Sequence, residues 1–279
     1  MHFTKMHGTG NDFVVIDGRT NHADWSRLAL AMNDRHFGIG GDGIIVAAPT
    51  DKADIRMRMF NPDGSEAEMC GNGIRCLAKY AAERGLVRPS NNAITVDTLN
   101  GVLTCTLLGD LRRVDSVRVS MGKPHLDPRE IPVIAEQAAP VVGLPIEAGG
   151  RRFDLTCVSM GNPHAVWFTT EAVDTFALDA IGPDVEHHPA FPRRVNFEIV
   201  NVVDPTKLKA RVWERGAGLT LACGTGACAV AVAARLNGII GGSADVELPG
   251  GTLHIDWDGV GEVFLTGPAV EVFEGEWNV

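Results

Sequence analysis

Two cysteines at matching positions could act as a pair of acid–base groups. Cys70 begins the segment Cys-Gly-Asn-Gly, and Cys223 begins the segment Cys-Gly-Thr-Gly. An Ala-rich stretch typical of a helix follows each one, so we expect each thiol at a helix start, where unpaired N–H groups and a partial positive charge lower its pKa. Two opposed thiols, one ionised and one protonated, can remove a proton from one face of a carbon and supply one to the other. The pair therefore indicates inversion of an α-carbon.

The two C-G-x-G segments belong to an internal duplication. Asn11 follows a glycine ahead of an aliphatic run, and Asn162 follows a glycine in the same way further along the chain. Arg58-Met59-Phe60 likewise matches Arg211-Val212-Trp213 at the cysteines' offset. Matches in one order at nearly one offset predict two homologous halves. We expect residues 1–120, completed by 267–279, to form the N-terminal half and residues 121–266 the C-terminal half.

The local pattern of each half predicts many short strands and few helices. Short runs bounded by Gly, Pro, Asn and Asp predict strands, and in several of them apolar and polar residues alternate. These runs are 55–59, 94–98, 102–107, 114–119, 153–158, 195–203, 208–213, 252–257 and 262–265. Helices are expected at 24–33, 73–84, 171–180 and 226–236. The last is apolar all round, so it must be enclosed. We therefore predict an α+β fold with two homologous halves, each a mixed or antiparallel sheet or incomplete barrel wrapped around a central helix, and the active site in the cleft between them.

Composition excludes several classes of partner. The 279 residues carry 25 basic and 35 acidic side chains, a formal net charge of −10, so a nucleic-acid partner is disfavoured. Neither an apolar stretch of about 18 residues nor a signal peptide is recognisable. Six cysteines are too sparse for a disulfide scaffold and should stay reduced. We expect a cytoplasmic protein with a small-molecule substrate and no membrane partner.

Other features of the sequence have less reactive interpretations. Cys76, Cys105, Cys157 and Cys228 lie inside apolar helices or strands, so we interpret them as structural. Their spacing lacks the paired C-x2-C of zinc sites, and we predict no metal. The glycine-rich segment 38–43 precedes a strand rather than a helix, which is not the pattern of a dinucleotide fingerprint. We interpret it as a turn lining the cleft.

At a set of specific segments the chain resembles the diaminopimelate epimerases. These segments spread over nearly the full length: Lys5-Met6-His7-Gly8-Thr9-Gly10-Asn11-Asp12-Phe13, Met59-Phe60-Asn61-Pro62-Asp63-Gly64-Ser65, Met69-Cys70-Gly71-Asn72-Gly73-Ile74-Arg75-Cys76, Gly161-Asn162-Pro163-His164, Asn196, Trp213-Glu214-Arg215-Gly216 through Thr220, and Ala222-Cys223-Gly224-Thr225-Gly226.

The resemblance implies an activity and a set of site residues. It implies interconversion of LL- and meso-2,6-diaminopimelate, in the route to lysine and peptidoglycan, without PLP, metal or other cofactor, by a homodimer. Cys70 and Cys223 would be the catalytic acid and base. The resemblance implies substrate binding by Asn11, Asn61, Gly71, Asn72, Asn162, Asn196, Glu214, Arg215, Gly224 and Thr225, and modulation of activity by His164 and Glu214. Some relatives have glutamine where this chain has Gly43, which cannot donate a side-chain hydrogen bond, so Gly43 is left out of the site.

Several alternatives use the same features. Proline and hydroxyproline racemases typically carry histidine where this chain has Asn72, and they lack the pattern from Trp213 to Gly216. An epimerase for another amino acid, such as histidine, would use the same cysteines, whereas the related phenazine-pathway isomerases lack the pair. A thiol-redox protein would favour cysteines close in sequence, and a non-catalytic binding protein would not need the second thiol.

Overall fold

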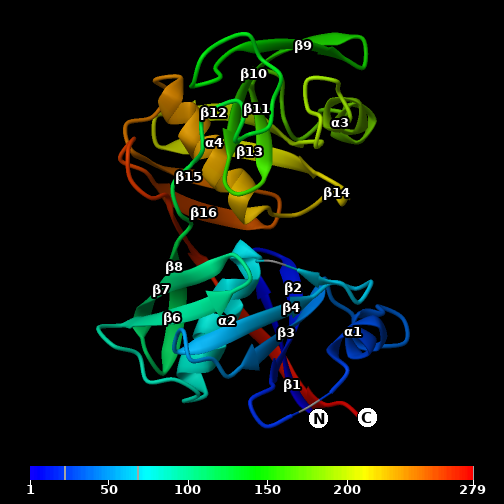
Figure 1. Cartoon of the computed structure of the whole chain (residues 1–279), viewed down its shortest axis with the longest axis vertical. Coiled ribbons are helices and arrows are strands. Elements are labelled where there is room, and N and C mark those ends of the chain that lie inside the picture. The colour runs from blue at the N-terminus through cyan, green and yellow to red at the C-terminus, as the bar shows by residue number, and fades with distance from the viewer. Residues whose placement is uncertain (22, 68, 279) are drawn as a thin grey trace. The chain divides into compact units, whose positions relative to one another are not determined.

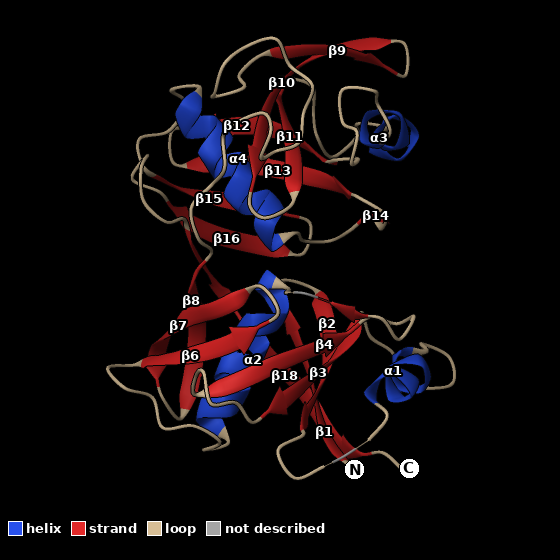
Figure 2. Cartoon of the chain, in the orientation of Figure 1, coloured by secondary structure: helices blue, strands red, loops and turns tan. Residues whose placement is uncertain are grey.

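The chain folds into two units, each built around one helix (Figure 1). The computed structural model describes residues 1–21, 23–67 and 69–278. The first unit comprises Met1–Ser120 and Thr266–Val279, and the second comprises Met121–Leu265. Each unit contains more strand than helix, with one long central helix and one shorter outer helix, as Figure 2 shows by colour.

The first unit has a mixed sheet that surrounds the helix α2 (Gly71–Glu83). Its elements in chain order are β1 (His2–Gly8), β2 (Asn11–Asp17), α1 (Trp25–Asn33), β3 (Gly43–Ala48), β4 (Ile55–Phe60), β5 (Glu66–Ala67), α2, β6 (Ala93–Thr98), β7 (Gly101–Asp110), β8 (Arg113–Ser120) and β18 (Val270–Glu276). Strand β18 pairs with β1, and the order continues through β2, β3, β4, β6, β7 and β8. The helix α2 contacts every strand from β1 to β4 and from β6 to β8.

The second unit repeats this arrangement around the helix α4 (Gly224–Leu236). Its elements are β9 (Leu144–Ala148), β10 (Arg151–Ser159), β11 (Pro163–Phe168), α3 (Leu178–Glu186), β12 (Asn196–Asp204), β13 (Lys207–Glu214), β14 (Gly218–Leu219), α4, β15 (Ser243–Leu248) and β16 (Gly251–Asp256). The strands pair in the order β9, β10, β11, β12, β13, β15, β16. The helix α4 contacts every strand from β10 to β13 and also β15 and β16.

The pairing pattern confirms the predicted duplication. In the first unit β2–β3 and β4–β6 are parallel, and in the second unit β11–β12 and β13–β15 are parallel at the same places in the order. Both central helices follow a short strand, β5 or β14, that pairs with the preceding long strand. The prediction of an α+β fold with two homologous halves, each a mixed sheet around a helix, is therefore correct.

The central helices form where their sequences favour complete enclosure. From Ala227 to Ala234 every residue of α4 is buried, so this helix has no exposed polar face along that stretch. Small alanine side chains let the surrounding strands approach the helix closely, which fills the interior at ordinary protein density. Helix α1 begins after Asp24, whose Oδ1 accepts a hydrogen bond from the backbone N–H of Arg27 at 3.1 Å. The predicted helices 24–33, 73–84 and 226–236 are confirmed within two residues.

The helix predicted at 171–180 is wrong over most of its length, because the structure starts α3 at Leu178. Other side chains hold the backbone of the preceding segment in an irregular turn. The backbone N–H of Val173 donates to Asn201 Oδ1 at 3.1 Å. Arg211 Nη1 donates to the carbonyl oxygens of Val173 and Phe176 at 2.8 and 2.9 Å. These long-range partners replace the local hydrogen bonds of a helix.

Gly182 in α3 lies directly against the ring of Trp213. A Cβ atom at Gly182 would lie 2.4 Å from Cδ2 and 2.5 Å from Cγ of that ring. We expect Gly182→Ala to lower the free energy of unfolding by about 1–3 kcal/mol, because the ring cannot move away without loosening the core. Thermal denaturation would measure the loss, with Asp184→Ala on the exposed side of α3 as the control. An unchanged melting temperature for Gly182→Ala would contradict this contact.

The last strands return the chain to its beginning. Strand β17 (Phe264–Pro268) leads from the second unit into the first, where it pairs with β8, and β18 then runs antiparallel to β1. The N-terminal ammonium of Met1 donates to the carbonyl oxygen of Trp277 at 2.7 Å, so the two ends of the described chain meet. None of the helices described has the length and apolar character to cross a membrane.

Candidate active site

Each predicted catalytic cysteine is the N-cap residue of a central helix. Cys70 has extended backbone angles of φ −138° and ψ 119°, and its sulfur accepts a hydrogen bond from the backbone N–H of Gly73 at 3.5 Å. Cys223 has φ −114° and ψ 115°, and its sulfur accepts from the N–H of Gly226 at 3.3 Å. The two sulfurs thus occupy the position where an N-cap oxygen normally accepts a hydrogen bond. The duplicated units place both thiols in the same local geometry.

In the first unit the Cys70 sulfur lies beside two asparagine side chains. It donates to Asn11 Oδ1 at 3.6 Å, and Asn72 Nδ2 donates to the same oxygen at 3.2 Å. Asn11 Nδ2 in turn donates to Asp42 Oδ2 at 2.6 Å. Asp42 belongs to the glycine-rich segment 38–43, so that segment holds Asn11 in place. The structure therefore groups Asn11, Asn72 and Cys70, three of the predicted site residues.

A buried arginine supports this cluster from within α2. Arg75 is fully buried, and its guanidinium donates to the Gly71 carbonyl oxygen at 2.9 Å, to Thr9 Oγ1 at 3.1 Å and to the Pro268 carbonyl oxygen at 3.2 Å. Thr9 Oγ1 donates to Asn72 Oδ1 at 3.2 Å. Arg75 thereby orients Asn72 through Thr9. The sequence offered one signal for this role, an arginine on the apolar face of a helix.

Asn61 takes part in a turn of its own. It follows β4, and its Nδ2 donates to Ser65 Oγ at 3.0 Å. Its backbone N–H donates to the Ser65 carbonyl oxygen at 2.9 Å. The hydrogen bonds described for Asn61 thus close the turn between β4 and β5.

In the second unit Cys223 begins a chain of polar contacts. Its sulfur lies 3.4 Å from Thr225 Oγ1, which accepts a hydrogen bond from Asn162 Nδ2 at 3.2 Å. His164 Nε2 lies 3.0 Å from Asn162 Oδ1. The structure therefore brings together Cys223, Thr225, Asn162 and His164, as the sequence predicted for one site.

His164 continues this chain to Glu198, a residue that was not predicted from the sequence. Its Nδ1 lies 2.6 Å from Oε1 of Glu198, and both side chains are almost completely buried. Burial raises the pKa of the Glu198 carboxyl, and the facing His164 only partly opposes this shift. A glutamate in an otherwise apolar run of β12 was the only sequence signal for Glu198.

The predicted residues Asn196, Glu214 and Arg215 meet at the end of β13. Asn196 Nδ2 donates to the Pro163 carbonyl oxygen at 2.7 Å, and its Oδ1 accepts from the backbone N–H of Arg215 at 2.9 Å. Thr220 Oγ1 donates to Glu214 Oε1. The Arg215 guanidinium donates to the Arg193 carbonyl oxygen at 3.2 Å.

Glu186, at the end of α3, fixes the turn that carries these residues. It accepts hydrogen bonds from Trp213 Nε1 at 2.7 Å and from the backbone N–H of Gly216 at 3.0 Å. The carboxylate thus holds the positions on either side of Glu214 and Arg215. No motif in the sequence pointed to Glu186.

The expectation of a lowered thiol pKa is wrong for Cys223. Burial raises its pKa well above the usual range, and the negative charges of Glu214 and Glu198 raise it further. Hydrogen bonds from Thr225 and from the N–H of Gly226 lower it only in part. Desolvation of the thiolate therefore outweighs the helix start at this position. The protonated thiol is the form that this environment favours at neutral pH.

Three of the cysteines interpreted as structural are deeply buried and inert. Burial raises the pKa of Cys76, Cys105 and Cys157 to about 12 in each case. A thiol with such a pKa forms almost no thiolate at neutral pH. Among residues 1–21, 23–67 and 69–278, no three His, Cys, Asp or Glu side chains are grouped closely enough to hold a metal ion.

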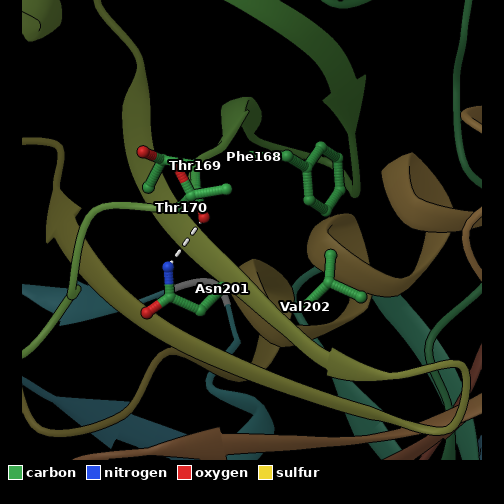
Figure 3. A pocket seen from close by; sticks show the side chains of 5 residues that line it. All are labelled: Phe168, Thr169, Thr170, Asn201 and Val202. Atoms are coloured by element: carbon green, nitrogen blue, oxygen red, sulfur yellow. Dashed lines mark hydrogen bonds between the residues drawn. The ribbon is translucent and has the colours of Figure 1, made fainter.

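A surface hollow in the second unit lies away from its cysteine. It has a volume of about 620 Å³ and is lined by Phe168, Thr169, Thr170, Asn201 and Val202 (Figure 3). Phe168 to Thr170 end or follow β11, and Asn201 and Val202 lie in the second half of β12. By contrast, His164 and Asn196 lie where these parallel strands begin. Asn201 Nδ2 donates a hydrogen bond to the Thr169 carbonyl oxygen at 2.7 Å. The hollow therefore lies at the opposite end of the strands from the Cys223 cluster.

Comparisons with known proteins agree with this arrangement. The family model described as Diaminopimelate epimerase matches residues 3–126 and 156–272. A protein named diaminopimelate epimerase from Pelotomaculum thermopropionicum is 51% identical to this chain over 280 residues, which cover 99% of both chains. Another of that name, from Acetivibrio thermocellus, is 51% identical over 278 residues, which cover 99% of this chain and 98% of its own.

Solved structures share the fold at low sequence identity. A phenazine biosynthesis protein of the PhzF family from Bacillus anthracis has a TM-score of 0.71 at 18% identity, covering 100% of this chain and 99% of its own. A probable proline racemase from Agrobacterium radiobacter has a TM-score of 0.69 at 14% identity, covering 100% and 93%. The family model and the half-identical relatives extend over nearly the whole sequence, so the chain belongs to the diaminopimelate epimerase family.

Proposed function

We propose that this protein interconverts LL- and meso-2,6-diaminopimelate by inverting one α-carbon, with Cys70 and Cys223 as the two acid–base groups. The observation that carries the proposal is the matched position of the two cysteines, each the N-cap residue of a central helix in one of two homologous units. Family membership supports diaminopimelate as the substrate. The isomerase needs no PLP, metal or other cofactor in this scheme.

The reaction moves one proton off the substrate and one onto it. The sulfur that is ionised takes the α-proton and becomes a thiol, while the other thiol gives its proton to the opposite face of the carbon and becomes a thiolate. Negative charge that develops toward the α-carboxylate is stabilised by N–H groups at the two helix starts. The two sulfurs end the reaction with exchanged proton states, so the same pair can serve the reverse direction.

The polar residues around the cysteines suit a zwitterionic substrate. Gly71, Asn72, Gly224 and Thr225 lie in the first turns of the two helices, where backbone N–H groups can bind the carboxylate at the reacting carbon. Glu214 would accept from an ammonium group and Arg215 would bind a carboxylate in bidentate fashion. We propose that the amides of Asn11, Asn61, Asn162 and Asn196 complete the binding of amino and carboxyl groups, and that His164 and Glu214 modulate the proton affinity of the site.

Turnover in heavy water tests the proposal directly. We expect LL-diaminopimelate in D2O to yield the meso isomer with deuterium at the inverted α-carbon, because the incoming proton comes from a thiol that exchanges with solvent. Chiral chromatography with mass spectrometry would follow both isomer and label. L-Proline and L-histidine serve as control substrates. Inversion of either amino acid, with none of diaminopimelate, would refute the assigned substrate.

We also propose that the enzyme is a homodimer that works in the cytoplasm. The chemistry requires reduced cysteines, and a reducing compartment keeps them so. Val270, Val272 and Phe273 on β18 are exposed apolar side chains of the kind that a subunit contact covers. Analytical ultracentrifugation would measure the mass in solution, and a monomer at assay concentrations would refute the dimer.

A further inference from the structure

One tight turn presents Glu214 and Arg215, the two charged residues of the proposed binding site. The N–H of Ala217 donates to the Glu214 carbonyl oxygen at 3.0 Å and closes this turn. Gly216, the third residue of the turn, has φ +78°, a left-handed value that glycine adopts without steric cost. The N–H of Arg215 donates to Asn196 Oδ1 at 2.9 Å. The turn is therefore closed within itself and also fixed to the start of β12.

Glu186, the last residue of α3, holds the turn from a third direction. Its Oε1 accepts hydrogen bonds from the N–H of Gly216 at 3.0 Å and from Arg194 Nη1 at 3.4 Å. Its Oε2 accepts from Trp213 Nε1 at 2.7 Å. An amide N–H, a guanidinium and an indole N–H can donate but cannot accept. These partners therefore require a group that accepts at both of its outer atoms, as a carboxylate does.

Helix α3 reaches Trp213 because Gly182 has no side chain. A Cβ atom at Gly182 would lie 2.4 Å from Cδ2 of the Trp213 ring. Gly182 and Glu186 lie one helical turn apart on the same face of α3. The close approach at Gly182 thus brings the Glu186 carboxylate to Nε1 of the same ring. Together these two residues dock α3 on the end of β13.

The segment that follows α3 also contacts the guanidinium of Arg215. The Arg193 carbonyl oxygen accepts from Arg215 Nη1 at 3.2 Å. Arg194, the next residue, forms the ion pair with Glu186. A guanidinium carries several N–H groups in a planar fork, so one contact of this kind still allows it to bind a carboxylate. Glu186 and the segment after it therefore act on both the backbone and the head of Arg215.

Stability alone does not explain a glutamate at this position. Glu186 is 3% exposed. Burial of a carboxylate costs free energy, and well-packed apolar side chains often stabilise a fold equally well or better. What an apolar side chain cannot do is accept from Gly216 and Trp213 on either side of Glu214 and Arg215. The carboxylate is better explained by the geometry that it imposes on these two residues.

We propose that Glu186 is a positioning residue for substrate binding, which holds the turn so that Glu214 and Arg215 meet the charged groups of the substrate in one fixed geometry. This inference rests on the proposed function, in which these two residues bind an ammonium group and a carboxylate. Glu186 acts through the backbone of Gly216 and the ring of Trp213, not by contact with the substrate.

The kinetics of Glu186→Gln test the proposal. Glutamine keeps the size of the side chain but places an NH2 group against one of the N–H donors, so one side of the turn loses its acceptor. We expect KM for diaminopimelate to rise about tenfold and kcat to change less than about threefold, because an interaction made equally in the ground state and the transition state is weakened. A merely structural glutamate would lower the melting temperature and leave KM unchanged.

Glu83→Gln is the matched control in the first unit. Glu83 is the last residue of α2, and its Oε1 accepts from the backbone N–H of Val114 at 2.6 Å and from Lys79 Nζ at 2.8 Å. It lies at the opposite end of α2 from Cys70. Its replacement should lower the melting temperature and leave KM unchanged. An equal rise of KM in Glu83→Gln and Glu186→Gln would indicate general damage and overturn the proposal.

Arg215→Lys tests whether Glu186 acts through the guanidinium. Lysine keeps the positive charge but lacks the planar fork. In this background Glu186→Gln should raise KM less than about threefold, because the geometry that Glu186 maintains is already lost. The same factor in both backgrounds would show that Glu186 does not act through Arg215, and the inference would be wrong.

Hydrogen exchange with mass spectrometry follows the turn itself, with no substrate present. Peptides that span 213–219 should exchange about tenfold faster in Glu186→Gln, because the turn opens more often, and peptides from α4 should be unchanged. If Glu186→Gln does not fold, Trp213→Phe replaces it, since this variant keeps the carboxylate and removes the indole donor. A folded Trp213→Phe with unchanged exchange at the turn and unchanged KM would then refute the proposal.

Turnover by the unaltered protein separates failure of this inference from failure of the proposed function. If that protein does not invert diaminopimelate, the proposed substrate is wrong, and exchange at the turn still decides whether Glu186 positions Glu214 and Arg215. If it does invert diaminopimelate and a folded Glu186→Gln has the same KM, only the role of Glu186 is wrong.

Discussion

Cys70→Ala and Cys223→Ala are each expected to reduce the rate of epimerisation by roughly 10²–10⁴-fold or more, the contribution typical of one acid–base group. Inversion needs a group on each face of the carbon, so either single substitution removes one half of the reaction. Conversion of LL- to meso-diaminopimelate, followed by chiral chromatography, would measure the loss. Both alanine variants should stay folded, because each removes only one sulfur atom at a helix start.

The control for these variants is another buried cysteine. Cys105 lies in β7 and its pKa is raised to about 12 by burial, so it forms almost no thiolate at neutral pH. Cys105→Ala should therefore retain turnover and lose only a little stability. Near-normal turnover by Cys70→Ala or by Cys223→Ala would refute the mechanism with two thiols, whatever the substrate.

Arg75→Ala should cause a large loss of stability. We expect the free energy of unfolding to fall by about 3–5 kcal/mol, because the substitution leaves a large cavity and removes the donor from two buried acceptors and one partly buried acceptor. Urea denaturation would measure the change. Arg75→Met, which fills most of the space but donates no hydrogen bond, should lose less.

Arg84 provides the comparison for Arg75 at the other end of α2. Its guanidinium forms ion pairs with Glu271 and Glu274 at a partly exposed position. Such pairs contribute about 0–1 kcal/mol, so Arg84→Ala should have a small effect. Equal losses for Arg75→Ala and Arg84→Ala would contradict a special role for the buried guanidinium.

The duplication and the helix starts were predictable because both depend on local sequence. The spacing of Cys70 and Cys223, each followed by an Ala-rich run, indicated two copies of one unit, and the structure places both as N-cap residues. The family was predictable from short, specific motifs, and the family model and the relatives confirm it. The enclosed helix α4 followed from its lack of any polar face.

The supporting residues were not predictable because their roles depend on contacts between distant segments. Glu198 and Arg75 are buried charges, and composition alone would place such residues at the surface. The prediction of a helix at 171–180 was wrong for the same reason. Asn201 and Arg211, which lie on other strands, form hydrogen bonds with the backbone of this segment. Burial raised the pKa of Cys223 against the effect of the helix start, and burial cannot be judged from a helix signal.

The pairing of β1 with β18 affects the order in which the chain can fold during translation. All of Met121–Leu265 leaves the ribosome before the strand that completes the sheet of the first unit. The second unit can therefore fold while one edge of β1 is still unpaired. Such an edge invites association with other chains. A ribosome that stalls or terminates before Thr266 would thus release a product with one finished unit and one unit prone to aggregate.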